Sequence, residues 1–147
     1  MRLLLCAAAP LCLFASQAYA QNTLTAAGSC VTSDKLEEVL RTNLGATKFR
    51  GVNCDTMVSV PKESVTFTRT GAAQDRVVFT GIVDAEGDMS VNTIALGTAA
   101  AIPVEMGFCN GGPVGTAGDT AMVCSAVYVQ GSEKVGISVI FQGKPRT

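Results

Sequence analysis

The sequence predicts an α+β domain in which one N-terminal helix packs on an antiparallel β-meander of about six strands. Two observations lead to this prediction. Residues 34–45 carry apolar side chains at helical spacing. From residue 56 onward Thr, Val, Ile and Phe predominate, and apolar positions alternate with polar ones, which is typical of half-buried strands. A small β-barrel or sandwich that uses the same strands and one helix is the alternative.

The predicted helix has recognisable start and stop signals. Asp34 can cap its N-terminus, with Glu37 three positions later in a variant of the capping box. Gly45 suits the left-handed conformation that ends many helices. One face of the helix is apolar, so we expect that face to lie on the sheet. The residues of this stripe are Leu36, Val39, Leu40 and Leu44.

The remainder of the chain predicts strands joined by short turns. Residues 21–29 are expected to form only a polar lead into the helix. The connections at 85–87 and 131–133 are too short for crossover helices and carry turn-forming residues, so neighbouring strands should pair antiparallel. The strands are expected at residues 57–60, 64–70, 76–84, 88–96, 121–130 and 134–142.

The N-terminal segment predicts an export signal. Arg2 provides a positive charge, residues 3–15 are mostly apolar, and Ala-Tyr-Ala at 18–20 forms an A-x-A cleavage site. The apolar stretch is shorter than the roughly 20 residues that a membrane-spanning helix needs. We therefore expect signal-peptide cleavage after residue 20 and a single mature domain of residues 21–147. That domain should lie in the periplasm or be secreted, and it should have no membrane span.

Four cysteines remain after the predicted cleavage, an even number in an oxidising compartment. Three pairings are possible. Two local bridges, Cys30 with Cys54 and Cys109 with Cys124, are preferred because each closes a loop around one structural element. A zinc site of four thiolates would need paired C-x-x-C motifs, which the sequence lacks. We therefore expect two disulfides and no metal site.

Composition removes several classes of function. The chain contains no histidine, which excludes Ser-His-Asp and Cys-His catalysis and His-ligated zinc. Its formal net charge of -1 provides no basic surface for nucleic acid. Asp84, Glu86 and Asp88 resemble the start of a calcium loop, but the twelfth position of such a loop is Ala95 rather than a glutamate. No catalytic residue and no cofactor are therefore predicted.

A glycine-rich stretch at residues 110–120 is the most unusual segment. It lies between Cys109 and Cys124, and it lacks the lysine and the following helix of a phosphate-binding loop. A connection between strands is the simpler interpretation. A partner-binding loop is the functional one, because recognition residues are frequent in loops on a rigid scaffold. The residues predicted for partner contact are Asn110, Gly111, Gly112, Pro113 and Asp119.

Together these features predict a non-enzymatic, exported binding or inhibitory module that acts on a protein or glycan partner. The alternative is an envelope assembly or accessory protein that pairs through an exposed sheet edge, for which the last strand is the candidate. A small hydrolase with a carboxylate or Ser-Lys site is a third, less favoured hypothesis. Its Ser59-x-x-Lys62 spacing is interrupted by Pro61, which blocks the helix that would align the two side chains.

Overall fold

The structure is a computed structural model that describes residues 23–114 and 119–146. The described chain contains one α-helix and ten strands. In chain order the elements are β1 (Leu24–Val31), α1 (Asp34–Leu44), β2 (Lys48–Arg50), β3 (Thr56–Val60), β4 (Ser64–Arg69), β5 (Ala72–Val83), β6 (Met89–Leu96), β7 (Ile102–Pro103), β8 (Met106–Val114), β9 (Asp119–Gln130) and β10 (Glu133–Pro145).

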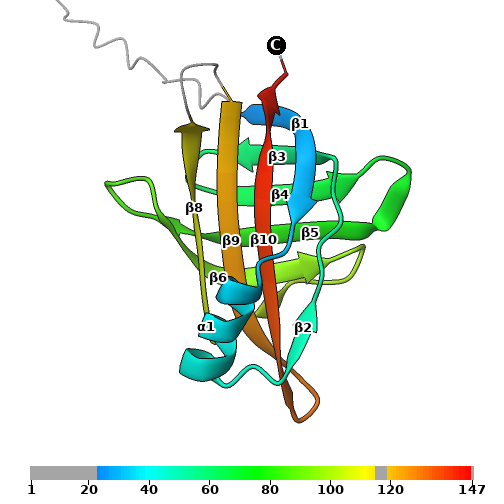
Figure 1. Cartoon of the computed structure of the whole chain (residues 1–147), viewed down its shortest axis with the longest axis vertical. Helices are drawn as coiled ribbons and strands as arrows, with labels where there is room; N and C mark the ends of the chain where they lie inside the picture. Colours follow the sequence, from blue (N-terminus) through cyan, green and yellow to red (C-terminus); the bar gives the residue numbers. More distant parts are fainter. Residues whose placement is uncertain (1–22, 115–118, 147) are drawn as a thin grey trace, which may run out of the picture.

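The strands form a closed antiparallel barrel (Figure 1). Eight strands follow one another around its wall in the order β1-β3-β4-β5-β6-β8-β9-β10, and β1 closes the wall by pairing with β10. β2 adds to β10 in parallel, and the short β7 pairs with β6. The predicted α+β meander with an open sheet is therefore wrong, and the small β-barrel given as the alternative fits.

β1 closes the barrel, and it lies where the sequence predicted only a polar lead. Its sequence, LTAAGSCV, contains few β-branched residues, so local propensity does not mark it as a strand. Partners on both sides stabilise it instead, because residues 24–27 pair with β3 and residues 26–31 pair with β10. Gly28 lets β10 come this close, since a β-carbon at this position would lie 2.0 Å from the Gln142 carbonyl oxygen.

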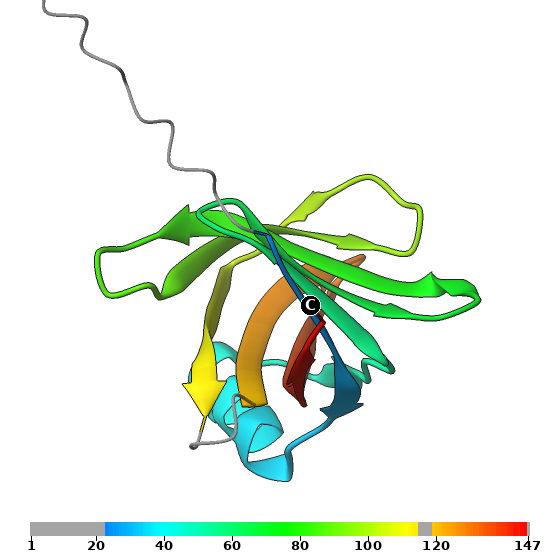
Figure 2. The same ribbon diagram turned by 90° about the horizontal axis from the view of Figure 1, so that it is seen from above.

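Two layers of strands cross at a steep angle. β3, β4, β5 and β6 run across β8, β9 and β10 in Figure 1, and the view from above in Figure 2 shows the two groups facing each other. Orthogonal packing of this kind encloses the core between the layers. The register between β5 and β6 shifts between Thr80 and Gly81, where Asn92 of β6 is the extra residue, and such bulges bend a strand and increase its twist.

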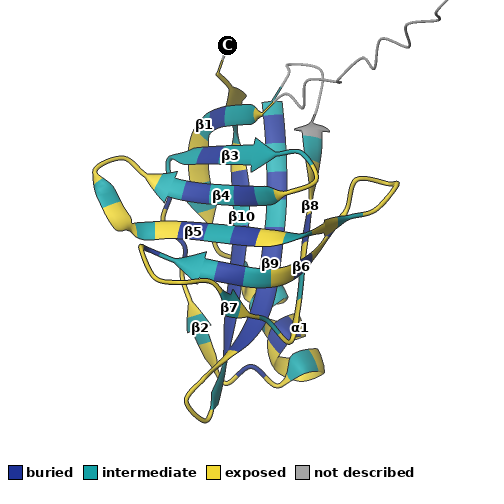
Figure 3. Cartoon of the chain, turned by 180° about the vertical axis from the view of Figure 1, so that it is seen from behind, coloured by how far each residue is buried: buried dark blue, intermediate teal, exposed yellow. Residues whose placement is uncertain are grey.

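Large apolar side chains fill the barrel interior. Along β4 buried positions alternate with more exposed ones, and on the neighbouring β5 Val77 and Phe79 are buried on either side of the less buried Val78. Figure 3 shows the buried positions of these strands in dark blue. The rings of Phe67 and Phe79 pack edge to face with centroids 5.9 Å apart, and the Phe141 ring lies 6.3 Å from that of Phe67. All three side chains are fully buried. This aromatic cluster closes the middle of the barrel.

α1 covers the outside of the barrel against β9 and β10 and spans the predicted residues. Its N-cap is Ser33 rather than the predicted Asp34, because the Ser33 hydroxyl accepts a hydrogen bond from the Leu36 backbone N–H at 3.4 Å. Gly45 ends the helix with a φ of 71°. Of the predicted apolar stripe, Leu40 alone is fully buried. The barrel therefore leaves part of the apolar face of the helix uncovered.

The predicted export signal and its cleavage site, residues 1–20, lie outside the described residues. α1 has 11 residues, and no helix in residues 23–114 or 119–146 combines the length and apolar character that crossing a membrane requires. The barrel strands share one hydrophobic core.

Candidate binding surface along β8

Two disulfides staple the barrel wall, and their pairing is the one preferred from the sequence. Cys109 and Cys124 lie directly opposite each other on β8 and β9, with Cα atoms 4.1 Å apart. This close spacing is that of a non-hydrogen-bonded pair in an antiparallel ladder. Cys30 on β1 is bonded to Cys54, just before β3, with Cα atoms 5.2 Å apart. Each bridge therefore joins neighbouring segments of the wall.

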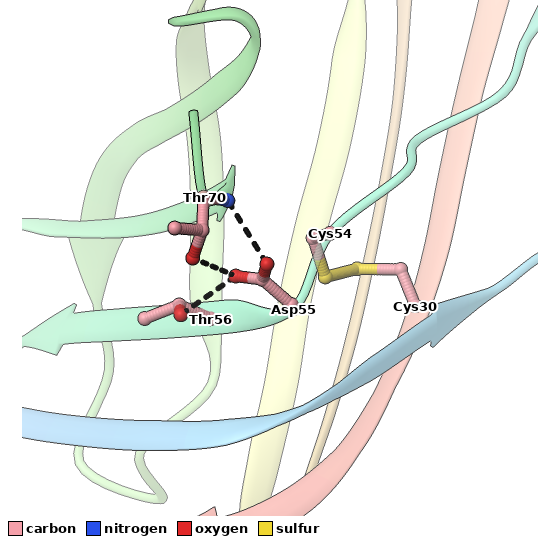
Figure 4. The surroundings of a disulfide bond; sticks show 5 residues. All are labelled: Cys30, Cys54, Asp55, Thr56 and Thr70. Carbon is pink, nitrogen blue, oxygen red and sulfur yellow. Dashed lines mark hydrogen bonds between the residues drawn. A yellow bond between two sulfur atoms is a disulfide. The ribbon is translucent and has the colours of Figure 1, made fainter. Parts of the chain in front are cut away.

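Asp55 organises the surroundings of the Cys30–Cys54 bridge (Figure 4). Its carboxylate accepts hydrogen bonds from the Thr70 N–H at 2.9 Å, the Thr56 hydroxyl at 2.9 Å and the Thr70 hydroxyl at 3.1 Å. The Thr70 N–H, followed by the Thr56 hydroxyl, holds the pKa of Asp55 below its usual value. Sequence reasoning missed Asp55 because Thr70 is 15 positions away. These bonds tie the end of β4 to the start of β3, so Asp55 has a structural role.

The glycine-rich stretch is a strand pair over most of its length. β9 pairs with all of β8, from Met106 to Val114. The expectation of a loop is therefore wrong for this part, because β9 supplies backbone partners that local propensity does not signal. Residues 115–118 lie outside the described residues. The residues predicted for partner contact are found in β8 (Asn110, Gly111, Gly112 and Pro113) and at the start of β9 (Asp119).

From Asn110 onward β8 pairs with β9 alone within the described chain, so its other edge is open. β6 reaches β8 at Phe108 and Cys109. Cys109 belongs to a non-hydrogen-bonded pair, so its backbone N–H and C=O point away from β9. Because such pairs recur at every second residue of an antiparallel ladder, the N–H and C=O of Gly111 also point away from β9. Pro113 has no N–H and shortens this edge. We call this segment, residues 110–114, the β8 edge.

The last strand does not have the open edge that the sequence suggested. β9 pairs with β10 along one side, at residues 133–143. β2 and β1 pair with its other side, at residues 135–137 and 140–145. Closure of the barrel therefore removes the edge of β10. The sheet edge offered by β8 from Asn110 onward, by contrast, is open.

An apolar surface adjoins the β8 edge where α1 approaches β8 (Figure 1). Three of its side chains are exposed: Val39 at 49%, Met106 at 58% and Phe108 at 41%. They lie around a hollow of about 130 Å³ whose wall also includes Leu40 and Leu44 of α1. We call these five residues the α1–β8 face. The sequence predicted none of them as binding residues, because their exposure depends on how α1 sits against the barrel.

Ser125 lines the hollow beneath the α1–β8 face. Its side chain is fully buried, and its Oγ has no hydrogen-bond partner in the described chain. A buried polar group left in this state costs about 1–3 kcal/mol, and native structures contain few of them. Ser125 is therefore a buried polar group without a partner among the described residues, and it lies beneath the α1–β8 face.

The acidic turn at residues 84–88 is a hairpin tip held by its own hydrogen bonds. The Asp84 carboxylate accepts the backbone N–H groups of Glu86 and Asp88 at 3.0 and 2.9 Å. Asp88 accepts a hydrogen bond from the side-chain amide of Asn110 on β8. Across the described ranges, no three His, Cys, Asp or Glu side chains are arranged to hold a metal ion. The Asp84 carboxylate therefore holds the hairpin tip together.

No protein-family model, curated protein or solved structure matches this chain. Its function must therefore be inferred from the chemistry of its described surfaces. Among these, the β8 edge and the α1–β8 face lie on the same strand and have the properties of a protein-docking surface.

Proposed function

We propose that the protein is an exported, non-enzymatic module that binds a protein partner along β8. The main support is that one strand combines an open backbone edge with an apolar outer surface. This combination favours the sheet-edge alternative predicted from the sequence over a module that binds through a loop. A protein suits the surface better than a glycan, because Met and aromatic residues are enriched at protein interfaces.

The exposed apolar side chains support docking because they are contiguous. Single exposed apolar residues are ordinary on protein surfaces, whereas a contiguous group marks an interaction site. Val39 on α1 and Met106 and Phe108 on β8 surround one hollow. Covering them is favourable by about 25 cal/mol for each Å² of apolar surface removed from water.

The hollow provides a place for one anchor residue of the partner. Its volume of about 130 Å³ is close to the roughly 150 Å³ of an engineered cavity that binds benzene. One phenyl ring or branched aliphatic side chain therefore fits. Anchors of this kind carry much of the binding energy in protein interfaces.

The β8 edge adds backbone hydrogen bonds to this anchor. An extended segment of the partner can pair with the N–H and C=O of Gly111, as in recognition by strand addition. Pro113 limits the length of that pairing because it offers no N–H. The partner segment is therefore short, and the α1–β8 face supplies the rest of the affinity.

The chemistry of the chain supports export and the absence of catalysis. Disulfides persist in oxidising compartments and are rare in the cytosol. The chain has no histidine to serve as an acid or base near neutral pH. Ser59 lies on β3 and Lys62 in the turn that follows, so the S-x-x-K spacing is not presented on a helix.

Site-specific photocrosslinking in the producing cells tests the proposal. A benzophenone side chain is introduced at position 108 or 112 and, as controls, at position 31 or 51. Val31 on β1 is exposed to a similar degree as Phe108, and both Gly51 and Gly112 have open space where a β-carbon would lie. We expect one protein to be crosslinked from positions 108 and 112 and from neither control. A crosslink to a second copy would identify the partner as the protein itself.

Purified components then measure the contribution of each feature. Phe108→Ser should weaken the complex with the crosslinked protein by at least about tenfold, because removing an interface anchor commonly costs about 2 kcal/mol or more. Gly112→Lys should weaken it by placing a charge on the β8 edge. Val31→Ser and Gly51→Lys should leave the affinity unchanged. Equal crosslinking from all four positions, or equal losses in the variants and their controls, would refute the proposal.

A further inference from the structure

A cavity of about 330 Å³ lies inside the end of the barrel that holds the β3–β4 and β5–β6 turns. Its wall is mostly apolar and includes Leu24, Val65, Val83, Met89 and Met122, together with the buried disulfide at Cys109. The aromatic cluster around Phe67 closes the barrel beyond it. Ligand cavities range upward from about 300 Å³, so this space suits a small molecule that enters from one end.

Lys62 is the one charged residue that lines this cavity. It forms no ion pair within the described chain. Neither Asp84 nor Asp88, in the β5–β6 turn at the same end of the barrel, lines the cavity or pairs with Lys62. The ammonium group of Lys62 is therefore available to an anion at the mouth of the cavity.

The backbone at Lys62 is unusual for a lysine. The Glu63 N–H donates to the Val60 carbonyl oxygen at 3.1 Å, which closes a turn with Pro61 and Lys62 at its centre. Lys62 has a φ of 63°, and no other non-glycine residue of the described chain has a positive φ. The third position of such a turn normally holds glycine or asparagine. Lys62 lines the cavity from this turn, and residues in such sparsely populated backbone conformations cluster at ligand sites.

We infer that this end of the barrel binds a small anionic amphiphile, a function additional to partner docking. The apolar body of the ligand occupies the cavity between Met89 and Met122, and its single anionic group pairs with Lys62. Two features set this ligand class. The apolar wall favours an uncharged hydrocarbon body, and the lone cation at the rim favours one negative charge over a neutral or positive headgroup.

Calorimetric titration with three matched probes tests the charge preference. Octanoate, 1-octanol and octylammonium share the same chain and differ in the charge of the headgroup. We expect octanoate to bind the mature protein about fivefold to tenfold more tightly than 1-octanol, the effect of one ion pair near a protein surface. Octylammonium should bind more weakly than either. Equal affinities for the three probes would overturn the inference.

Variants at the rim assign the preference to one side chain. Lys62→Gln should reduce the affinity for octanoate to that for 1-octanol, whereas Lys62→Arg should retain it. Lys35→Gln is the matched control, since Lys35 is an exposed lysine on α1. Lys62→Gly should lose the preference too, and folding is not at risk because glycine relieves the positive φ.

Methyl NMR spectra of the methionines locate the bound probe. Met89 and Met122 line the cavity, whereas Met106 lies exposed on the α1–β8 face. Octanoate should shift the methyl resonances of Met89 and Met122 and leave that of Met106 unchanged. Shifts confined to Met106 would show adsorption on the docking surface, and no binding of octanoate up to its solubility limit would leave the cavity without this ligand. Either result would refute the inference.

Discussion

Replacing Ser125 by alanine should raise the free energy of unfolding by about 1 kcal/mol. The Ser125 side chain is fully buried, and its Oγ has no hydrogen-bond partner in the described chain. Such a group costs about 1–3 kcal/mol, and we take the lower end because the neighbouring hollow leaves the site incompletely packed. Ser125→Ala removes the oxygen and keeps the β-carbon, so it creates almost no additional cavity.

Urea-induced unfolding with intact disulfides, followed by circular dichroism, measures this change. With an m value of about 1.5 kcal/mol per M, a gain of about 1 kcal/mol raises the unfolding midpoint by about 0.7 M while m stays constant. Ser90→Ala is the control, because it is the same substitution at an exposed strand position. It should alter the free energy of unfolding by less than about 0.5 kcal/mol. A lower midpoint for Ser125→Ala alone would mean that the hydroxyl has a stabilising partner.

Lys62→Gly should raise the free energy of unfolding by about 0.5–1 kcal/mol, because glycine adopts a φ of 63° without the penalty of other residues; an unchanged Tm would contradict this. Joint replacement of Cys109 and Cys124 by alanine should lower the free energy of unfolding by about 3 kcal/mol, the value expected for a bridge that spans 15 positions. A loss under about 1 kcal/mol would show that strand pairing alone holds this part of the wall. Asp55→Asn should destabilise the protein near neutral pH and have no effect in strong acid. Since the folded pKa of Asp55 is lowered, its ionised form stabilises the fold above the ordinary Asp value near 3.9, and this contribution disappears as the pH falls through the lowered pKa. If the Tm values of the wild-type protein and of Asp55→Asn differ by the same amount at every pH, the ionised form of Asp55 does not have this stabilising role.

Local signals in the sequence predicted the elements whose partners are close along the chain. The apolar spacing and Gly45 placed α1 correctly, although Ser33 rather than Asp34 provides the cap. The strands that became β3, β4, β5, β6, β9 and β10 were all expected, and short turns join several of them. In these segments the hydrophobic period and the turn residues are sufficient, because helix and hairpin contacts span few residues.

Two strands that were not predicted, β1 and β8, lack the composition typical of strands, and β1 also depends on a partner far away in the sequence. β1 is rich in small residues and is stabilised by β10, near the other end of the described chain. β8 contains three glycines and a proline, and the disulfide and β9 hold it in place. Since β1 converts an open sheet into a barrel, the fold class depends on a strand that its own sequence does not signal.

The candidate site, like the fold, is only partly visible in local sequence signals. The predicted contact residues around Gly111 do lie on the strand with the open edge, because unusual glycine content was visible in the sequence. The α1–β8 face was not predicted. Packing between elements determines which side of α1 the barrel leaves uncovered. It also determines that Ser125 lies beneath this side without a hydrogen-bond partner in the described chain. A sequence pattern shows that a helix has an apolar face, and it does not show how much of that face is covered.

Closure of the wall by β1 and β10 imposes an order on strand pairing as the chain folds during its synthesis. The hairpins between neighbouring strands can form soon after both strands emerge, on a timescale of about microseconds. The β1–β10 ladder must wait for the end of the chain, and contacts of such long sequence separation form slowly. Until then β1 lacks one of its two neighbours and presents unpaired backbone groups to other chains. The arrival of β10 therefore ends the period in which the β1 edge of each new molecule is prone to aggregation.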